Sequence, residues 1–142
     1  MKTNHKSSIS LAALALAALA LGACKSASAP EVKLIESHTA KDLEISLLSE
    51  KGELAQGQNR FFLEFRSASD KKPADVGSVP FSSSMAMPGM APMTAPLELE
   101  PAGGTGRYAV KGDFAMSGAW RFEVRWDGAA RQGSISFNSN VR

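Results

Sequence analysis

The chain has 142 residues, of which 44% are hydrophobic and 21% charged, and its formal net charge is +2 at neutral pH. The single cysteine excludes a disulfide within the chain, and the lack of a basic block argues against nucleic-acid binding. The length suits one modest domain that rests on a hydrophobic core.

The N-terminus has the pattern of a bacterial lipoprotein signal. Two lysines precede an apolar run from Ile9 to Leu21, which is shorter than the roughly 20 residues of a membrane-spanning helix. The run ends in Leu21-Gly22-Ala23-Cys24, which resembles the lipobox that is cleaved before a lipid-bearing cysteine. We therefore expect a signal peptide at residues 1–23 and lipidation of Cys24. The alternative is an ordinary secretory signal followed by an unrelated cysteine.

Cleavage at this position would change the charge and set the location. It removes two of the 16 basic residues and none of the 14 acidic ones, so the mature chain is close to neutral. Lys25, after the cysteine, is not a signal for inner-membrane retention, which favours an outer-membrane anchor facing the periplasm or the cell exterior. Residues 24–39 are expected to form the lipidated N-terminus and a flexible tether.

Residues 40–142 have the pattern of one all-β domain. Apolar and polar residues alternate with a period of two, which is typical of half-buried strands. The clearest alternating stretches are 42–47, 61–66, 120–127 and 134–138. Turns are predicted at Gly103–Gly106, before a strand at 107–111, and around Asp127–Ala130. About seven strands would form an immunoglobulin-like antiparallel β-sandwich.

One segment breaks this pattern. Residues 82–96 contain three prolines and a glycine, which predicts an irregular loop. Four of the five methionines expected after cleavage lie in this loop, at positions 85, 87, 90 and 93, and the fifth is Met116. A thioether sulfur is a soft, neutral ligand that suits Cu(I). Methionine also persists in an oxidising compartment, where cysteines pair.

Two other interpretations of the methionines stay open. Their flexible side chains would also suit the filling of one end of the sandwich, or an apolar surface for a partner protein. His38 is the only histidine expected after cleavage, and a lone histidine is more often an ordinary surface residue than a ligand. Glu98 and Glu100 fit the solvent face of a strand.

Three short motifs, in this order and spacing, resemble the YtkA-like or FixH-like family. They are Met85-Ala86-Met87-Pro88-Gly89-Met90, Gly106-Arg107-Tyr108 and Met116-Ser117-Gly118-Ala119-Trp120. The resemblance covers roughly residues 40–138. It implies a small extracytoplasmic β-sandwich associated with copper handling, through metal efflux or the maturation of haem–copper oxidases.

The resemblance also implies ligands for copper. By position, Met87 and Met90 match the methionine pair of the family's Met-Pro-x-Met motif, and Met116 matches the methionine before Gly-x-Trp. Met85 and Met93 are further candidates. Many relatives have a histidine in or after this loop, whereas Ala91–Thr94 contain none. This difference favours Cu(I) over Cu(II).

No motif points to catalysis, and we expect no enzymatic activity. Cys24 is expected to be lipidated, one histidine gives no triad, and Gly103–Gly106 lacks the lysine of a phosphate-binding loop. The expected partners are a membrane, through Cys24, and an envelope protein of metal efflux or oxidase assembly. The alternative function is a metal-free interaction domain of such an envelope complex.

Overall fold

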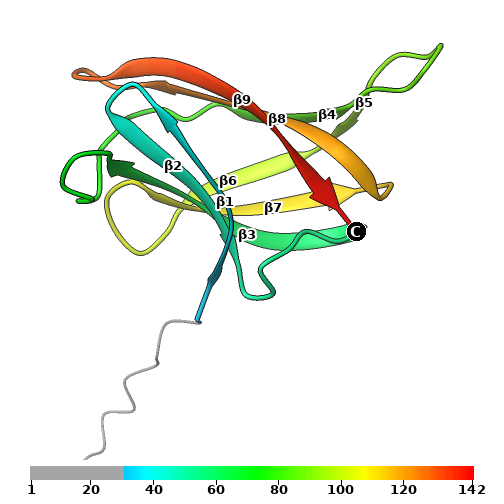
Figure 1. Cartoon of the computed structure of the whole chain (residues 1–142), viewed down its shortest axis with the longest axis horizontal. Coiled ribbons are helices and arrows are strands. Elements are labelled where there is room, and N and C mark those ends of the chain that lie inside the picture. The colour runs from blue at the N-terminus through cyan, green and yellow to red at the C-terminus, as the bar shows by residue number, and fades with distance from the viewer. Residues whose placement is uncertain (1–30) are drawn as a thin grey trace, which may run out of the picture.

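Two antiparallel β-sheets pack face to face in the computed structural model, which describes residues 31–142 (Figure 1). The five-stranded sheet has the order β1-β2-β3-β7-β6, and the four-stranded sheet has the order β5-β4-β8-β9. The strands are β1 (Lys33–Ala40), β2 (Leu43–Ser49), β3 (Gly57–Ser67), β4 (Phe81–Met85), β5 (Met93–Ala95), β6 (Leu97–Pro101), β7 (Arg107–Phe114), β8 (Gly118–Asp127) and β9 (Gln132–Val141). Within the described residues the chain forms no helix that could cross a bilayer. The expected signal peptide, Cys24 and the first part of the tether lie outside the described residues.

The core lies between the two sheets and follows the predicted alternation. On β8 both tryptophans are buried, with Trp120 0% and Trp126 2% exposed, while Arg121 and Arg125 point to solvent. The inner residues of β2 and β3 that face them are Leu43, Ile45, Leu47, Phe61, Leu63 and Phe65. Burial of each large apolar side chain stabilises the fold by about 1.5–3 kcal/mol. The β-sandwich predicted from the sequence is therefore confirmed.

The structure contains more strands than the sequence predicts. β1 begins at Lys33, inside the segment expected to be a tether. β4 and β5 lie at the two ends of the segment expected to be irregular. The prolines do not prevent these strands, because Pro92 and Pro96 stand just outside the two ends of β5. The expectation of an unbroken irregular loop over 82–96 was therefore wrong.

The outer face of β3 is less exposed than its alternation suggests. Phe62 and Glu64 lie on this face but are each only 7% exposed. The guanidinium carbon of Arg107 sits 4.5 Å from the centre of the Phe62 ring. Glu64 pairs with both Arg66, at 3.1 Å, and Arg107, at 3.3 Å. The long arginine side chains thus cover this part of the sheet.

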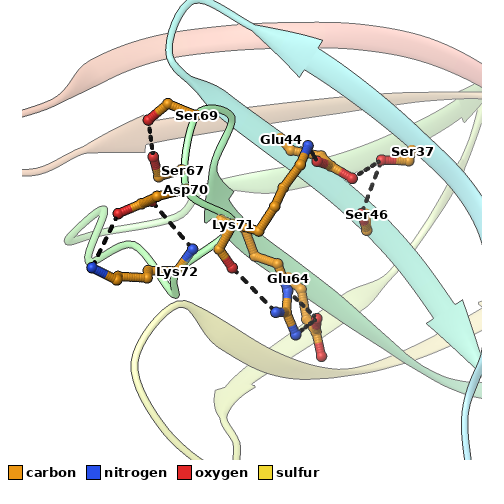
Figure 2. A network of polar contacts seen from close by, with 10 residues as sticks. Ser37, Glu44, Ser46, Glu64, Ser67, Ser69, Asp70, Lys71 and Lys72 are labelled. Atoms are coloured by element: carbon orange, nitrogen blue, oxygen red, sulfur yellow. Dashed lines mark hydrogen bonds and ion pairs between the residues drawn. The ribbon is translucent and has the colours of Figure 1, made fainter.

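A polar network continues across the outer face of β2 and into the segment after β3 (Figure 2). Glu44 accepts hydrogen bonds from the ammonium group of Lys71 and from the Ser37 hydroxyl, and both lower the pKa of Glu44. The Ser67 hydroxyl and the backbone N–H of Lys72 lower the pKa of Asp70. These contacts tie the segment after β3 to the sheet.

The network predicts that the fold loses stability in acid. The pKa of Glu44 in the folded chain lies below its ordinary value of 4.5. The stabilisation is therefore present above that value and is lost as the pH falls through the lowered pKa. We expect Glu44→Gln to melt with a smaller drop in Tm between neutral and acid pH than the wild type. Glu98→Gln, at an exposed carboxylate of β6, is the control and should keep the full drop.

Candidate metal centre

The β4–β5 hairpin places two methionines side by side. Met85 on β4 stands directly opposite Met93 on β5, and Ser83 stands opposite Ala95. Side chains of such opposed residues share one face of the sheet, with Cβ atoms about 4.5–5.5 Å apart. Met85 is 8% exposed and belongs to the core, and the half-buried Met93 packs against it. Both thioethers therefore reach the interior at the same end of the sandwich.

A tight turn after β4 separates the next two methionines. The N–H of Met90 donates to the carbonyl oxygen of Met87 over 3.1 Å, and Gly89 between them has φ 74°. This is the geometry of a turn with proline second and glycine third, as in Pro88-Gly89. Met87 is half-buried and packs against the core, whereas Met90 is 66% exposed. The turn therefore directs one methionine inward and the other to solvent.

Met116 approaches the same end from the turn between β7 and β8. The β4–β5 hairpin and this turn both lie at the right-hand end of the molecule in Figure 1. The terminal methyl of Met85 lies 2.6 Å from the position that a Cβ would occupy on Gly118, two residues after Met116. Gly118 leaves room for the Met85 side chain because it has no Cβ. The turn that carries Met116 thus lies against the β4–β5 hairpin at one end of the sandwich.

Trp120 holds the turn that carries Met116. Its indole N–H donates to the carbonyl oxygen of Met116 over 3.0 Å. The indole is fully buried and packs edge-on against Phe114, with ring centroids 5.1 Å apart. The buried and tightly packed indole fixes the position of the Met116 backbone. The Met116 side chain remains 42% exposed. The sequence contains this tryptophan as part of a motif, but only the fold shows its hydrogen bond.

The structure does not bring His38 to the methionines. The His38 ring stacks on Phe137 of β9, with centroids 4.4 Å apart, and its Nε2 lies 3.0 Å from Glu36. β1 and β9 are edge strands on one side of the sandwich, whereas β5 is the opposite edge of the four-stranded sheet. His38 is therefore a packed and hydrogen-bonded residue remote from the hairpin. Glu98 and Glu100 lie exposed on β6, as expected.

The soft donors that the structure places at this end of the sandwich are thioether sulfurs. Among residues 31–142, no group of three or more His, Cys, Asp or Glu side chains is placed to hold a metal ion. Met85, Met87 and Met93 come from the hairpin, and Met116 comes from the neighbouring turn. Several thioethers can satisfy the low coordination number of Cu(I), and their softness selects it over hard divalent ions.

Solved structures include several chains that are similar to this one, and the first of them supports the fold. A DUF4426 family protein from Pseudomonas aeruginosa matches 75% of this chain and 96% of its own, with a TM-score of 0.51 and 13% identity. PcoC, a copper resistance protein from Escherichia coli, matches 63% of this chain and 89% of its own, with a TM-score of 0.42 and 15% identity. A copper-bound variant of FetP from uropathogenic Escherichia coli matches 78% and 97%, with a TM-score of 0.43 and 6% identity. No curated protein matches the sequence.

The family assignment rests on the sequence itself. The model of the YtkA-like family matches residues 37–125, which is more than half of the chain. This range runs from β1 through most of β8 and includes the hairpin, the turn with Met116 and Trp120. The chain therefore belongs to the YtkA-like family.

Proposed function

We propose that this protein binds Cu(I) through a methionine cluster, which consists of Met85, Met87, Met93 and Met116. The observation that supports the proposal is the pairing of Met85 with Met93 on the hairpin and the close approach of Met85 to Gly118, in the turn that carries Met116. The thioethers remain neutral at every pH, so the cluster would hold a soft monovalent ion without burying a carboxylate.

The exposure of Met116 supports a ligand site at this end, whereas Met85, Met87 and Met93 lie in or against the core. In the described part of the chain, the exposed large apolar residues are Leu34, Met90 and Met116. Two of these three are methionines at the same end of the sandwich. A side chain that served only to fill the core would be buried. In this proposal the half-buried and exposed methionines are the ones that an ion reaches first from solvent.

The cellular role follows from the expected location. Lipid on Cys24 would hold the domain at a membrane, facing the periplasm or the cell exterior. There the cluster would collect Cu(I) and pass it to an envelope protein of metal efflux or oxidase assembly. The protein acts in this proposal as an accessory that binds and transfers copper, not as an enzyme.

The cluster predicts a binding defect that is separable from folding. Leucine keeps the size and apolar character of methionine but has no sulfur. We expect Met87→Leu, Met93→Leu and Met116→Leu together to weaken Cu(I) binding by about a hundredfold or more. The measurement is anaerobic titration against a competing Cu(I) chelator, with Tm recorded in parallel.

The resemblance implied Met90 as a ligand, but the proposed cluster leaves it out because its side chain is 66% exposed. Met90→Leu, in the same hairpin, is therefore the matched control. We expect this variant to retain most of the affinity. Unchanged affinity in the triple variant, with an unchanged Tm, would show that the cluster is not the copper site. In the wild type, Cu(I) or Ag(I) should raise the Tm with increasing concentration.

The exposure of Met90 and Met116 also supports a second candidate function, an apolar contact surface for an envelope protein. Under this alternative the protein binds no metal. Met90→Gln would then reduce capture of the partner, and neither Cu(I) nor Ag(I) would shift the Tm. Partner capture by Met90→Gln, together with the Tm shift caused by Cu(I) or Ag(I), therefore separates the two functions.

A further inference from the structure

The two sheets end in four edge strands, β1 and β6 in one sheet and β5 and β9 in the other. An edge strand presents unpaired backbone N–H and C=O groups to which another chain can pair. Proteins block such edges with charged residues, prolines, bulges or short strands. The four edges of this sandwich differ sharply in these features.

Three of the edges are protected. β1 has an irregular register between Leu34 and Glu36, which bends the strand away from regular pairing. β5 has only three residues and lies between Pro92 and Pro96. β6 carries two glutamates and ends at Pro101. The backbone of each of these strands would therefore pair poorly with another chain.

β9 has none of these features. It runs for 10 residues, Gln132–Val141, and its register with β8 is unbroken over that length. The strand contains no ionisable residue and no proline. Hydrogen bonds from the rest of the described chain to the β9 backbone lie at its two ends, where Leu54 also bridges Val141. The ammonium of Lys41 donates to the carbonyl of Gln132 over 2.9 Å, and the N–H of Arg142 donates to the carbonyl of Leu54 over 2.9 Å.

The hairpin turn fixes which backbone groups of β9 point outward. Gly128 and Arg131 donate to each other's carbonyl, over 2.9 and 3.3 Å, and so form a hydrogen-bonded pair. In an antiparallel ladder such pairs alternate with pairs whose backbone groups point away. The outward-pointing residues of β9 are therefore Gln132, Ser134, Ser136, Asn138 and Asn140, and the bond from Lys41 to Gln132 agrees with this phase.

Most of these outward groups have no backbone partner within the described residues. Neither the strand pairing nor the remaining backbone hydrogen bonds involve the outer sides of Ser134, Ser136 and Asn138. The edge beside Asn140 is occupied, because Leu54 forms a parallel bridge with Val141. The three open residues are exposed. β1, the neighbouring edge of the other sheet, reaches β9 through the ring of His38 on Phe137, which is a side-chain contact. The central part of the β9 edge thus stays open.

We propose that a second copy of this chain pairs antiparallel along β9 and forms a symmetric dimer. A two-fold axis at Ser136 would set this residue opposite Ser136 of the partner subunit, and Ser134 opposite Asn138 of the partner subunit, within the open part of the edge. The four-stranded sheets of the two copies would then join into one. The uncharged strand favours a second copy, because a symmetric pair brings identical segments together without repulsion between like charges.

This dimer does not depend on the proposed copper function. Pairing uses the edge of the four-stranded sheet opposite to β5, so it leaves the methionine end open. Because the two β9 strands would run in opposite directions, the methionine ends of the two copies would point away from each other. Failure of copper binding would therefore not affect the dimer, and loss of the dimer would not remove the copper site.

The test is sedimentation equilibrium of the full chain, exported by the cell and purified in density-matched detergent. The wild type should be a dimer that dissociates on dilution through the micromolar range. Ser136→Pro removes an N–H that points away from β8, which an edge strand tolerates. We expect it to weaken dimerisation about tenfold or more, because each subunit loses a hydrogen bond. Ser136→Ala keeps that N–H and should dimerise like the wild type.

A second variant covers the case in which the proline variant does not fold. Ser136→Lys combined with Asn138→Lys leaves the backbone intact and sets like charges across the axis. This double variant should be a monomer with a near-normal Tm. A wild type that is monomeric up to near-millimolar concentration would overturn the proposal. So would a dimer that persists unchanged in the folded proline or lysine variants.

Discussion

Replacing Trp120 with alanine is expected to lower the free energy of unfolding by about 3–5 kcal/mol. The side chain is fully buried and is the largest of the fully buried residues. Its removal leaves a cavity next to Phe114, which packs on the indole at 5.1 Å between centroids. Urea unfolding of the wild type and the variant measures the difference. Arg121→Ala, at the exposed neighbour on the same strand, should change the stability by less than about 0.5 kcal/mol.

Trp120→Phe separates the packing of this residue from its hydrogen bond. Phenylalanine keeps an aromatic ring in the core but cannot donate to the carbonyl oxygen of Met116. We expect the variant to remain folded and to bind Cu(I) about tenfold less tightly, because the turn that carries Met116 loses its anchor. Full affinity in Trp120→Phe, with a large loss in Met116→Leu, would show that Met116 is a ligand whose position does not depend on the indole.

The strands that the sequence predicts best are those whose burial alternates without interruption. β8 is the clearest, since Trp120, Phe122, Val124 and Trp126 are all buried and the residues between them are not. The hydrophobic effect selects this pattern locally, so it can be read without knowing the partner strands. The sequence pattern did not predict β1. Its register shifts between Leu34 and Glu36, which disrupts the alternation of buried and exposed residues. Its pairing with β2 depends on a strand that lies later in the chain.

The candidate site was predictable in composition but not in arrangement. The concentration of methionine at 82–96 is visible in the sequence, and so is the motif that contains Met116. The register that sets Met85 opposite Met93, and the close approach of Met85 to Gly118, arise from contacts between strands. Spacing within one segment carries no information about such contacts. The exposure of Met90 likewise depends on the turn at Pro88-Gly89.

Replacement of Gly106, the glycine of the motif Gly106-Arg107-Tyr108, is expected to have the second large effect on stability. Gly106 has φ 71°, a conformation that costs a residue with a Cβ about 1–2 kcal/mol. A Cβ at this position would also lie against the carbonyl oxygen of Ala74 and 2.7 Å from that of Phe65. These are backbone atoms, and the carbonyl of Gly106 accepts a hydrogen bond from the N–H of Phe65 over 2.7 Å. We expect Gly106→Ala to cost about 2–5 kcal/mol in the free energy of unfolding.

Gly103 provides a control within the same turn. Its φ is 72°, almost the same as that of Gly106, but a Cβ there would have no atom within 4 Å. Gly103→Ala should therefore show only the conformational cost, about 1–2 kcal/mol. The excess in Gly106→Ala measures the contact with the backbone of Ala74 and Phe65, by urea unfolding of both variants. Equal losses would mean that this backbone moves aside at little cost. A clear excess, with Cu(I) affinity unchanged in the folded fraction, would assign Gly106 to the fold and leave the metal site to the methionines.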